Sequence, residues 1–178
     1  MRRLMDAAMT SFNERGYHAT RVNDIVEIAK TSHGTFYLYF SNKEDLVTAL
    51  VGEVATEASG LLAKLRRPPI EETSWEFLRS WIGDYSALWT RYAPLFRSWT
   101  DLTSTDTEQS ELIQRTVNAL TEAMASRISR VELDSAVAGM AVIAMLDRFH
   151  YMRELTYEPV ESDALDTLTT FVHRALFN

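Results

Sequence analysis

The chain has 178 residues, no cysteine and a formal net charge of −7. The length suits one or two compact units that bury enough surface to fold without disulfides. The missing cysteines exclude a disulfide framework, a zinc–thiolate site and a cysteine nucleophile. They also suit a reducing compartment, so we expect a cytoplasmic protein.

The charge is unevenly distributed. Up to Arg67, nine lysines and arginines stand against eight acidic residues, whereas the rest of the chain has nine against seventeen. Such an asymmetry hints at a nucleic-acid-binding module joined to an acidic remainder. The N-terminus lacks the apolar core of a signal peptide, and the longest apolar run, residues 136–146, is too short to span a bilayer. No membrane partner is therefore expected.

The apolar spacing is helical throughout, which predicts an all-α protein. Gly16 is placed to end the first helix, while Thr20 and Ser32 are placed to cap the next two. Ser41 and Glu44 have the capping-box spacing that opens a longer helix. The expected N-terminal helices cover residues 4–15, 20–30, 32–39 and 42–66.

The Pro68-Pro69 pair breaks the chain after the long helix. Longer amphipathic segments follow, and Thr105 with Glu108 forms another possible capping box. The expected C-terminal helices cover residues 73–92, 94–99, 105–130 and 132–155, with a last helix after Pro159. We divide the chain into an N-terminal domain, residues 1–45, and a helical domain, residues 46–178.

The stretch SHGTFYLYF, residues 32–40, crowds four aromatic rings behind a glycine. Two short helices joined by a turn and braced by a third describe a helix-turn-helix, whose second helix must fit a groove about 12 Å wide. Gly34 keeps that helix thin where it approaches DNA. Phe36 and Phe40 lie one turn apart and are expected to face the core. Tyr37 and Tyr39 lie off that face, where a hydroxyl can reach a phosphate or a base edge.

Residues 4–50 resemble the signature of the tetracycline-repressor (TetR) family of bacterial regulators. The matching positions are Phe12, Gly16-Tyr17, Thr20, Asp24-Ile25, Ala29, Ser32, Gly34-Thr35-Phe36-Tyr37, Tyr39-Phe40 and Lys43-Glu44-Asp45-Leu46. The resemblance implies a homodimer with an N-terminal three-helix DNA-binding domain. It also implies a C-terminal helical domain that dimerises and often holds a small effector.

Carried over position by position, the resemblance assigns roles in DNA binding. Thr20 and Tyr39 would bind phosphate, and Lys43 would clamp the DNA backbone. His33 would face the major groove together with Thr35 and Tyr37. The chain departs from the family at Lys30, where glycine is usual, so the turn is expected to be strained or Lys30 to add a phosphate contact. The expected DNA-binding residues are Thr20, Arg21, Ser32, His33, Gly34, Thr35, Tyr37, Tyr39 and Lys43.

An aromatic stripe marks the start of the second domain. Aromatic residues at helical spacing are usually core, yet pockets for drug-sized ligands are also mostly apolar. We therefore keep both interpretations open, core packing and a cavity for an apolar or aromatic effector. The candidate ligand-binding residues are Trp75, Trp81, Tyr85, Trp89, Tyr92, Phe96, Trp99, Met140 and Phe149.

The run 136–146 is apolar all round and is expected to be enclosed on all sides. A homodimer interface formed with the last helix, through an intersubunit four-helix bundle, would supply that enclosure. His150 either contacts an effector or is a satisfied interface histidine. Asp147 and His150 lack the paired repeats of a di-iron bundle. We find no metal site, no cofactor motif and no catalytic residues, so we do not expect an enzyme.

The sequence thus predicts a dimeric, sequence-specific DNA-binding regulator of transcription, a repressor released from a palindromic operator by a small apolar or aromatic ligand. One alternative is a regulator of the same fold without a small-molecule effector. Another alternative is a helical carrier or enzyme, but this interpretation does not explain the pattern of residues from Ser32 to Lys43.

Overall fold

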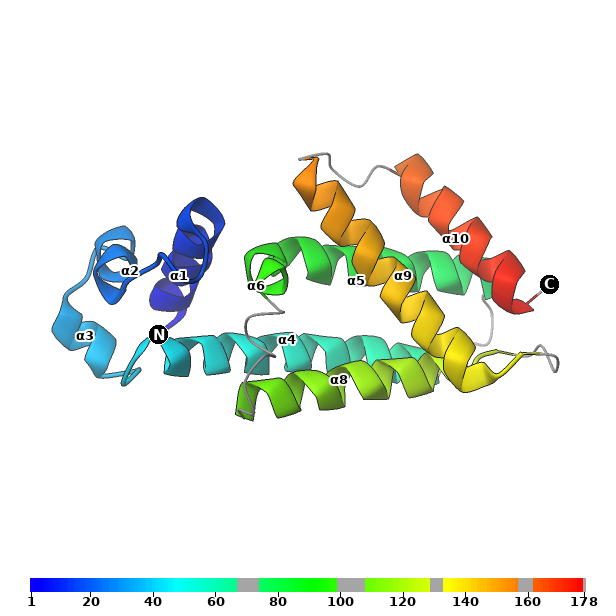
Figure 1. The fold of residues 1–178 in the computed structure, drawn as a ribbon, viewed down its shortest axis with the longest axis horizontal. Coiled ribbons are helices and arrows are strands. Elements are labelled where there is room, and N and C mark those ends of the chain that lie inside the picture. The colour runs from blue at the N-terminus through cyan, green and yellow to red at the C-terminus, as the bar shows by residue number, and fades with distance from the viewer. Residues whose placement is uncertain (67–73, 99–107, 129–132, 157–161, 178) are drawn as a thin grey trace. The chain divides into compact units, whose positions relative to one another are not determined.

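A computed structural model describes residues 1–66, 74–98, 108–128, 133–156 and 162–177. Within these ranges the protein is helical and contains no strand, as the periodicity predicts (Figure 1). The helices are α1 (Arg2–Arg15), α2 (Val22–Ile28), α3 (His33–Tyr37), α4 (Lys43–Arg66), α5 (Ser74–Arg91), α6 (Ala93–Arg97), α8 (Glu108–Ala125), α9 (Ser135–Leu155) and α10 (Ser162–Phe177).

The chain folds as two compact units, each built from two stretches of sequence. The first unit comprises Met1–Ala55 and Tyr92–Ile113. The second comprises Thr56–Arg91 and Gln114–Asn178. Helices α4 and α8 each contribute residues to both units. From the sequence we divided the chain between residues 45 and 46, into two parts with different expected functions. This functional division stays a prediction.

The first unit is organised around α1, which packs against α2 and α6, while α2 packs against α3. One face of α1 is buried, as its apolar spacing predicts, and Gly16 ends the helix with a φ of 81°. Phe36 of α3 is fully buried, and such burial stabilises by about 1.5–3 kcal/mol. Further buried residues of this unit are Leu4, Met5, Ala8, Phe12, Ile25, Phe40, Leu46 and Leu50.

The N-terminal caps of α2 and α4 differ from the expected ones by one residue. The helix α2 is capped at Arg21, whose backbone N–H donates to Asp24 Oδ2 at 2.8 Å. Before α4, Asn42 Oδ1 accepts from the backbone N–H of Asp45 at 2.7 Å, and Asp45 Oδ2 accepts from the N–H of Ser41 at 2.9 Å. The reciprocal arrangement predicted for Ser41 and Glu44 is thus made by their neighbours. The cap predicted at Ser32 is confirmed, because its hydroxyl accepts from the Thr35 N–H at 3.1 Å.

The second unit is organised around α5, which packs against α10 and α9. Trp81 of α5 is buried and donates from Nε1 to the Leu61 carbonyl at 3.0 Å. Gly139 of α9 lies so close to α8 that a Cβ atom there would stand 2.7 Å from the Thr121 carbonyl oxygen and 2.9 Å from the Ala125 nitrogen. Gly139 thus allows a close approach of two helices within the chain, α8 and α9.

The run 136–146 is not fully enclosed by the described part of its own chain, and the expected enclosure by a second copy stays a prediction. Ile143 and Leu146 are buried, but Val137 is 62% exposed and Met140 is 61% exposed. The reason is geometric, because α5 and α8 cover only part of the surface of α9.

By length and composition, α4 meets the criteria for a membrane-crossing helix. From the sequence we expected no membrane span, on the ground that the longest apolar run, residues 136–146, is too short. In the structure its apolar side chains are core residues of both units, among them Leu46 and Leu50 in the first and Leu61 and Leu65 in the second. Core helices of water-soluble folds satisfy the same criteria, so this is weak evidence for a membrane span.

Candidate nucleic-acid interface and effector region

The helix α3 separates a buried face from an exposed one. Phe36 is fully buried and Phe40 is 5% exposed, and their rings lie 5.7 Å apart. On the other side Tyr37 is 57% exposed and Tyr39 is 53% exposed. The sequence prediction for all four rings is therefore confirmed by their burial. The phenol groups of the two tyrosines are available to a partner.

The N-terminal half of α3 is also accessible. His33 and Gly34 are exposed and Thr35 is half-buried. A Cβ atom added at Gly34 would meet only the Ser32 hydroxyl, at 3.6 Å, so the space outside Gly34 is open. Ser32 and Thr35 exchange a hydroxyl contact of 3.1 Å, and this ties the start of the helix together. The structure thus brings His33, Gly34 and Tyr37 onto one accessible surface.

The turn between α2 and α3 contains the strain that the sequence predicts. Lys30 has a φ of 50°, in the left-handed region that disfavours side chains with a Cβ. The turn closes through a hydrogen bond from the Thr31 N–H to the Val26 carbonyl at 2.9 Å. Lys30 itself is exposed, so its ammonium group is also free to approach a phosphate.

Thr20 differs from the expectation that it presents a hydroxyl to phosphate. The residue is only 2% exposed. Its Oγ1 donates to the Gly16 carbonyl at 2.9 Å and lies 3.0 Å from the Ser11 hydroxyl. The hydroxyl is therefore used inside the unit, to hold the loop between α1 and α2. Arg21, the next residue, is exposed at the start of α2.

Lys43, at the start of α4, also has internal partners. Its Nζ donates to the Tyr17 carbonyl at 2.8 Å and to the Thr20 carbonyl at 3.1 Å. The ammonium group also lies over the Tyr17 ring, 4.1 Å from its centroid. Partial burial lowers the pKa of Lys43. Burial, with a further contribution from Glu44, raises the pKa of Tyr17 to about 12. Lys43 thus fastens the loop before α2 to the start of α4, which the sequence did not reveal.

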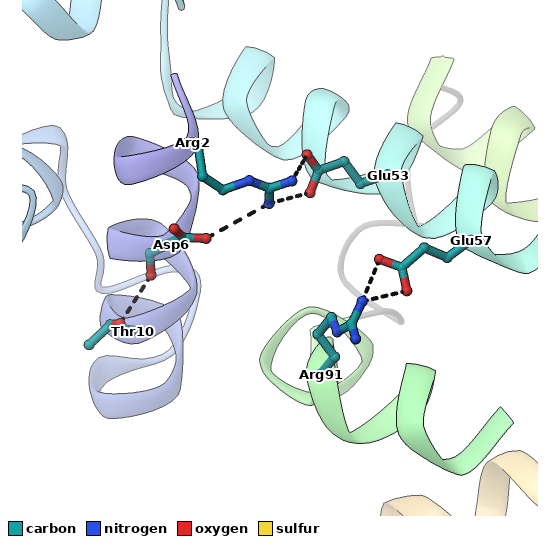
Figure 2. Close-up of polar contacts among 6 residues, drawn as sticks. All are labelled: Arg2, Asp6, Thr10, Glu53, Glu57 and Arg91. Atoms are coloured by element: carbon teal, nitrogen blue, oxygen red, sulfur yellow. Dashed lines mark hydrogen bonds and ion pairs between the residues drawn. The ribbon is translucent and has the colours of Figure 1, made fainter. Parts of the chain in front are cut away.

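The two arginines ahead of this surface already have partners. Figure 2 shows Arg2 of α1 reaching Glu53 of α4 with two guanidinium nitrogens, at 2.8 and 2.7 Å. Asp6 lies 3.8 Å from the same guanidinium group. Arg3 donates to the Ala29 carbonyl at 2.5 Å. Both arginines therefore help to hold the first unit together.

One accessible residue was missing from the expected set. Leu38 follows α3 and is 81% exposed, between two exposed tyrosines. The signal in the sequence is its position, because a residue one turn beyond Gly34 shares the outward side of the helix. From the sequence, Leu38 was expected beside the groove, where it could meet a thymine methyl group, but it was not counted among the DNA-binding residues.

In the second unit, the aromatic stripe of α5 is joined to α9 by polar contacts. Tyr85 is 5% exposed, stacks against Trp81 with ring centroids 5.5 Å apart, and donates its hydroxyl to Asp147 Oδ1. Burial raises the pKa of Tyr85 well above its usual value, and Asp147 adds to the effect. Burial also raises the pKa of Asp147, against the opposing hydrogen bonds from Tyr85 and Trp89.

His150 lies beside this contact and is 1% exposed. Its Nδ1 lies 2.7 Å from the Leu146 carbonyl, which can only accept, so Nδ1 carries the proton of the neutral ring. Nε2 then accepts from the Ser86 hydroxyl at 2.6 Å. Burial lowers the pKa of His150. The ring stacks on Trp89 with centroids 5.8 Å apart. His150 is thus a satisfied histidine in the core of the second unit, whereas the sequence left open an effector contact or a satisfied interface histidine.

The other candidate effector residues have different surroundings. Trp75 is half-buried and donates to the Thr170 hydroxyl at 3.2 Å, while Phe149 is half-buried with its ring 5.3 Å from that of His150. Met140 is largely exposed on α9. Tyr92 and Phe96 belong to the first unit, and Trp99 lies outside the described residues. Whether these residues bind a ligand stays a prediction.

An open hollow of about 700 Å³ lies along α10. Its described lining is one side of that helix and includes Phe171, which is 64% exposed. The lining residues are Asp166, Thr167, Thr170, Phe171, Arg174 and Ala175. No group of three or more metal-ligating side chains occurs among the residues that the structure covers.

Comparisons with known proteins agree with the geometry of the first unit. Residues 4–50 match the pattern of the bacterial regulatory proteins of the TetR family. Residues 4–50 thus carry the N-terminal pattern of the TetR family. A curated relative, the fatty acid metabolism regulator protein of Bacillus subtilis strain 168, is 44% identical over 50 residues, which are 28% of this chain and 26% of that protein. The match to this TetR-family relative thus spans about a quarter of its length.

Solved structures of TetR-family proteins resemble the chain over nearly its whole length. The fatty acid degradation regulator FadR of Bacillus halodurans is 25% identical with a TM-score of 0.72, covering 98% of this chain and 93% of that one. A TetR-like transcriptional regulator of Rhodococcus sp. RHA1 is 22% identical with a TM-score of 0.77, covering 98% and 94%. The second similarity shows the fold alone. It extends the TetR-like fold to the C-terminal helices.

Proposed function

We propose that the protein is a sequence-specific DNA-binding regulator of transcription. The observation that carries the proposal is the two-sided character of α3. Phe36 is buried, while His33, Gly34 and Tyr37 form a thin, accessible surface. A surface of this width suits the major groove of DNA. The match of residues 4–50 to the TetR-family pattern supports the same function.

The phosphate contacts are assigned to residues around this surface. Arg21, Lys30 and Tyr39 are exposed near α3 and offer charged or hydroxyl groups. Thr20 and Lys43 support them from within, since they hold the loop before α2, and the third N–H of Lys43 remains for a phosphate. Because phosphate contacts release counterions, the affinity should fall steeply with salt. We expect the protein to act in the cytoplasm, where bacterial DNA lies.

We further propose that two copies of the chain pair through α9 and α10. Val137 and Met140 on α9 and Phe171 on α10 are all more than 60% exposed. Exposed large apolar side chains on α9 and α10, two helices that follow one another in the chain, are typical of an interaction surface. A two-fold dimer would place its two α3 helices in successive major grooves about 34 Å apart, so the operator would be near-palindromic.

Regulation by a small ligand is the finer part of the proposal. The rings of Trp81, Tyr85 and Trp89 would contact an apolar or aromatic effector. Such a ligand would release a repressor only if it binds the non-DNA-binding arrangement more tightly. Helix α4 contributes to both units and would carry the change. The alternative is a regulator of the same fold without a small-molecule effector.

The DNA-binding proposal is tested by selecting fragments of the source genome that bind the purified protein. We expect one recurring near-palindrome, with enrichment lost in Tyr37→Ala. Tyr151→Ala, on α9, is the matched control and should enrich the same fragments. No enrichment at low salt, also after unfolding and refolding to remove any bound ligand, would refute the proposal.

The effector proposal is tested on the selected fragment. Binding is measured with and without aromatic hydrocarbons, and with a long-chain acyl thioester because two similar proteins are named as fatty acid regulators. A releasing compound should lose its effect in Trp89→Ala, while DNA binding without ligand stays unchanged. If no compound changes DNA binding, the regulator without an effector is favoured.

A further inference from the structure

Leu38 is the most exposed large apolar side chain among the described residues, at 81%. A lone exposed leucine on a protein surface is ordinary. Leu38 is not alone, because Tyr37 and Tyr39 beside it are 57% and 53% exposed. The three residues form a continuous, partly apolar surface at the end of α3, and this surface adjoins the residues proposed to enter the groove.

The backbone places Leu38 on the same side of the helix as Gly34. Its φ of −71° and ψ of −25° continue the helical conformation by one residue, and its N–H donates to the Gly34 carbonyl at 3.1 Å. Residues one turn apart are neighbours on a helix surface. The space outside Gly34 is open, since a Cβ there would meet only Ser32 Oγ. The leucine side chain therefore borders this open space, which an apolar occupant would cover.

The chemistry of the groove identifies that occupant. A leucine side chain has no donor or acceptor, so it cannot read the hydrogen-bonding edges of the bases. In the major groove the C5-methyl of thymine is the one apolar group that a base pair presents. We propose that Leu38 is a specificity-determining residue that selects thymine at one position of each operator half-site, through contact with this methyl group. The inference rests on the proposed DNA-binding function.

The experiment uses the full-length protein and the operator fragment obtained by selection. Each thymine is replaced in turn by deoxyuracil, which keeps the hydrogen-bonding edge and the base pairing and removes only the methyl group. We expect one symmetrical position to weaken binding by about fourfold per half-site, and by about fifteenfold when both half-sites are substituted. The other thymines should show little change.

Leu38→Ala then decides which residue reads the methyl group. In this variant the sensitive position should bind thymine and deoxyuracil equally well. Because Leu38 is exposed, the variant should fold like the original protein, which is checked by its circular dichroism and melting temperature. Leu133→Ala, at another exposed leucine, is the control and should keep the full preference for thymine.

The outcomes separate the two proposals. If no operator is selected at all, the proposed function fails. If an operator is found and no thymine is sensitive to loss of its methyl group, the inference about Leu38 is wrong while the function stands. The inference is equally wrong if a sensitive thymine remains sensitive in Leu38→Ala, since another side chain then reads the methyl group.

Discussion

Lys30 holds the turn of the helix-turn-helix in a conformation that lysine disfavours, with a φ of 50°. A left-handed residue with a Cβ costs about 1–2 kcal/mol, and glycine avoids this cost but loses more entropy on folding. We predict that Lys30→Gly raises the free energy of unfolding by about 0.5–1 kcal/mol in urea titrations. Lys30→Ala keeps the Cβ, removes the charge and should show no gain. Equal stabilisation by both variants would show that the charge, and not the backbone, is responsible.

Lys43 is predicted to stabilise the first unit as well as any DNA complex. Its ammonium group donates to two backbone carbonyls, those of Tyr17 and Thr20. Hydrogen bonds from a charged donor contribute about 1.5–3 kcal/mol. Lys43→Met should therefore lower the free energy of unfolding by an amount in that range, measured without DNA.

A matched lysine provides the control for that measurement. Lys64 forms an ion pair with Asp84, and both side chains are about half exposed. Exposed ion pairs contribute about 0–1 kcal/mol, so Lys64→Met should change stability little. If the two substitutions have the same effect, the internal contacts of Lys43 do not stabilise the fold.

For single side chains around α3, the sequence predicted exposure to solvent better than it predicted hydrogen-bond partners. The burial of Phe36 and Phe40 and the exposure of Tyr37 and Tyr39 follow from helical spacing. The internal hydroxyl contacts of Thr20 could not be predicted, because they depend on how Ser11 and the Gly16 carbonyl fold back over the loop. The same holds for Lys43, whose acceptors lie far away in the sequence.

At the scale of the helices, α8 and α9 cross closely at Gly139, more closely than any neighbour approaches the other glycines. A methyl group at Gly139 would clash with backbone atoms of Thr121 and Ala125, which cannot move aside cheaply. Overpacking of this kind costs about 1–3 kcal/mol, so Gly139→Ala should lower the melting temperature measurably.

Gly60 of α4 tests whether that loss is specific to the crossing. A Cβ there meets no atom within 4 Å, and alanine has the better helix propensity by about 1 kcal/mol. Gly60→Ala should therefore raise the melting temperature. A loss in both variants, or in neither, would contradict the assignment of a tight crossing to Gly139.

Helix positions were predicted well and helix ends less so. The segments expected at residues 73–92 and 132–155 correspond to α5, Ser74–Arg91, and α9, Ser135–Leu155. The cap of α4 was predicted one residue early, because Ser41 and Asn42 can both cap a helix and local spacing does not choose between them. Hydrogen bonds in the folded protein make the choice, in favour of Asn42.

At the scale of the whole molecule, we predict that two chains associate through the exposed apolar side chains of α9, among them Val137 and Met140. Met140→Glu would place an unpaired charge in the proposed interface, at a cost of several kcal/mol, and should weaken the dimer more than 100-fold. Sedimentation velocity measures the change. Leu38→Glu introduces the same charge on α3 and should leave the dimer intact. A dimer that survives Met140→Glu would contradict pairing through α9.

The division of the chain into its two compact units could not be predicted from the sequence. The Pro68-Pro69 pair marks the end of α4 correctly, but residues 92–113 belong to the same compact unit as the N-terminus. Such grouping depends on contacts between distant segments, for example that of α1 with α6, which periodicity does not encode.

The central claim is that the accessible side of α3 binds DNA, and Gly34 tests it most directly. A Cβ atom at Gly34 would meet only the Ser32 hydroxyl, so we expect Gly34→Leu to place its side chain in the open space on that side. Gly60→Leu makes the same substitution on α4, where a Cβ atom meets nothing within 4 Å. The measurement is the affinity of both variants for the selected operator, with folding and dimerisation checked alongside. The account predicts at least a 100-fold loss for Gly34→Leu and none for Gly60→Leu. Undiminished binding by a folded Gly34→Leu dimer would contradict it.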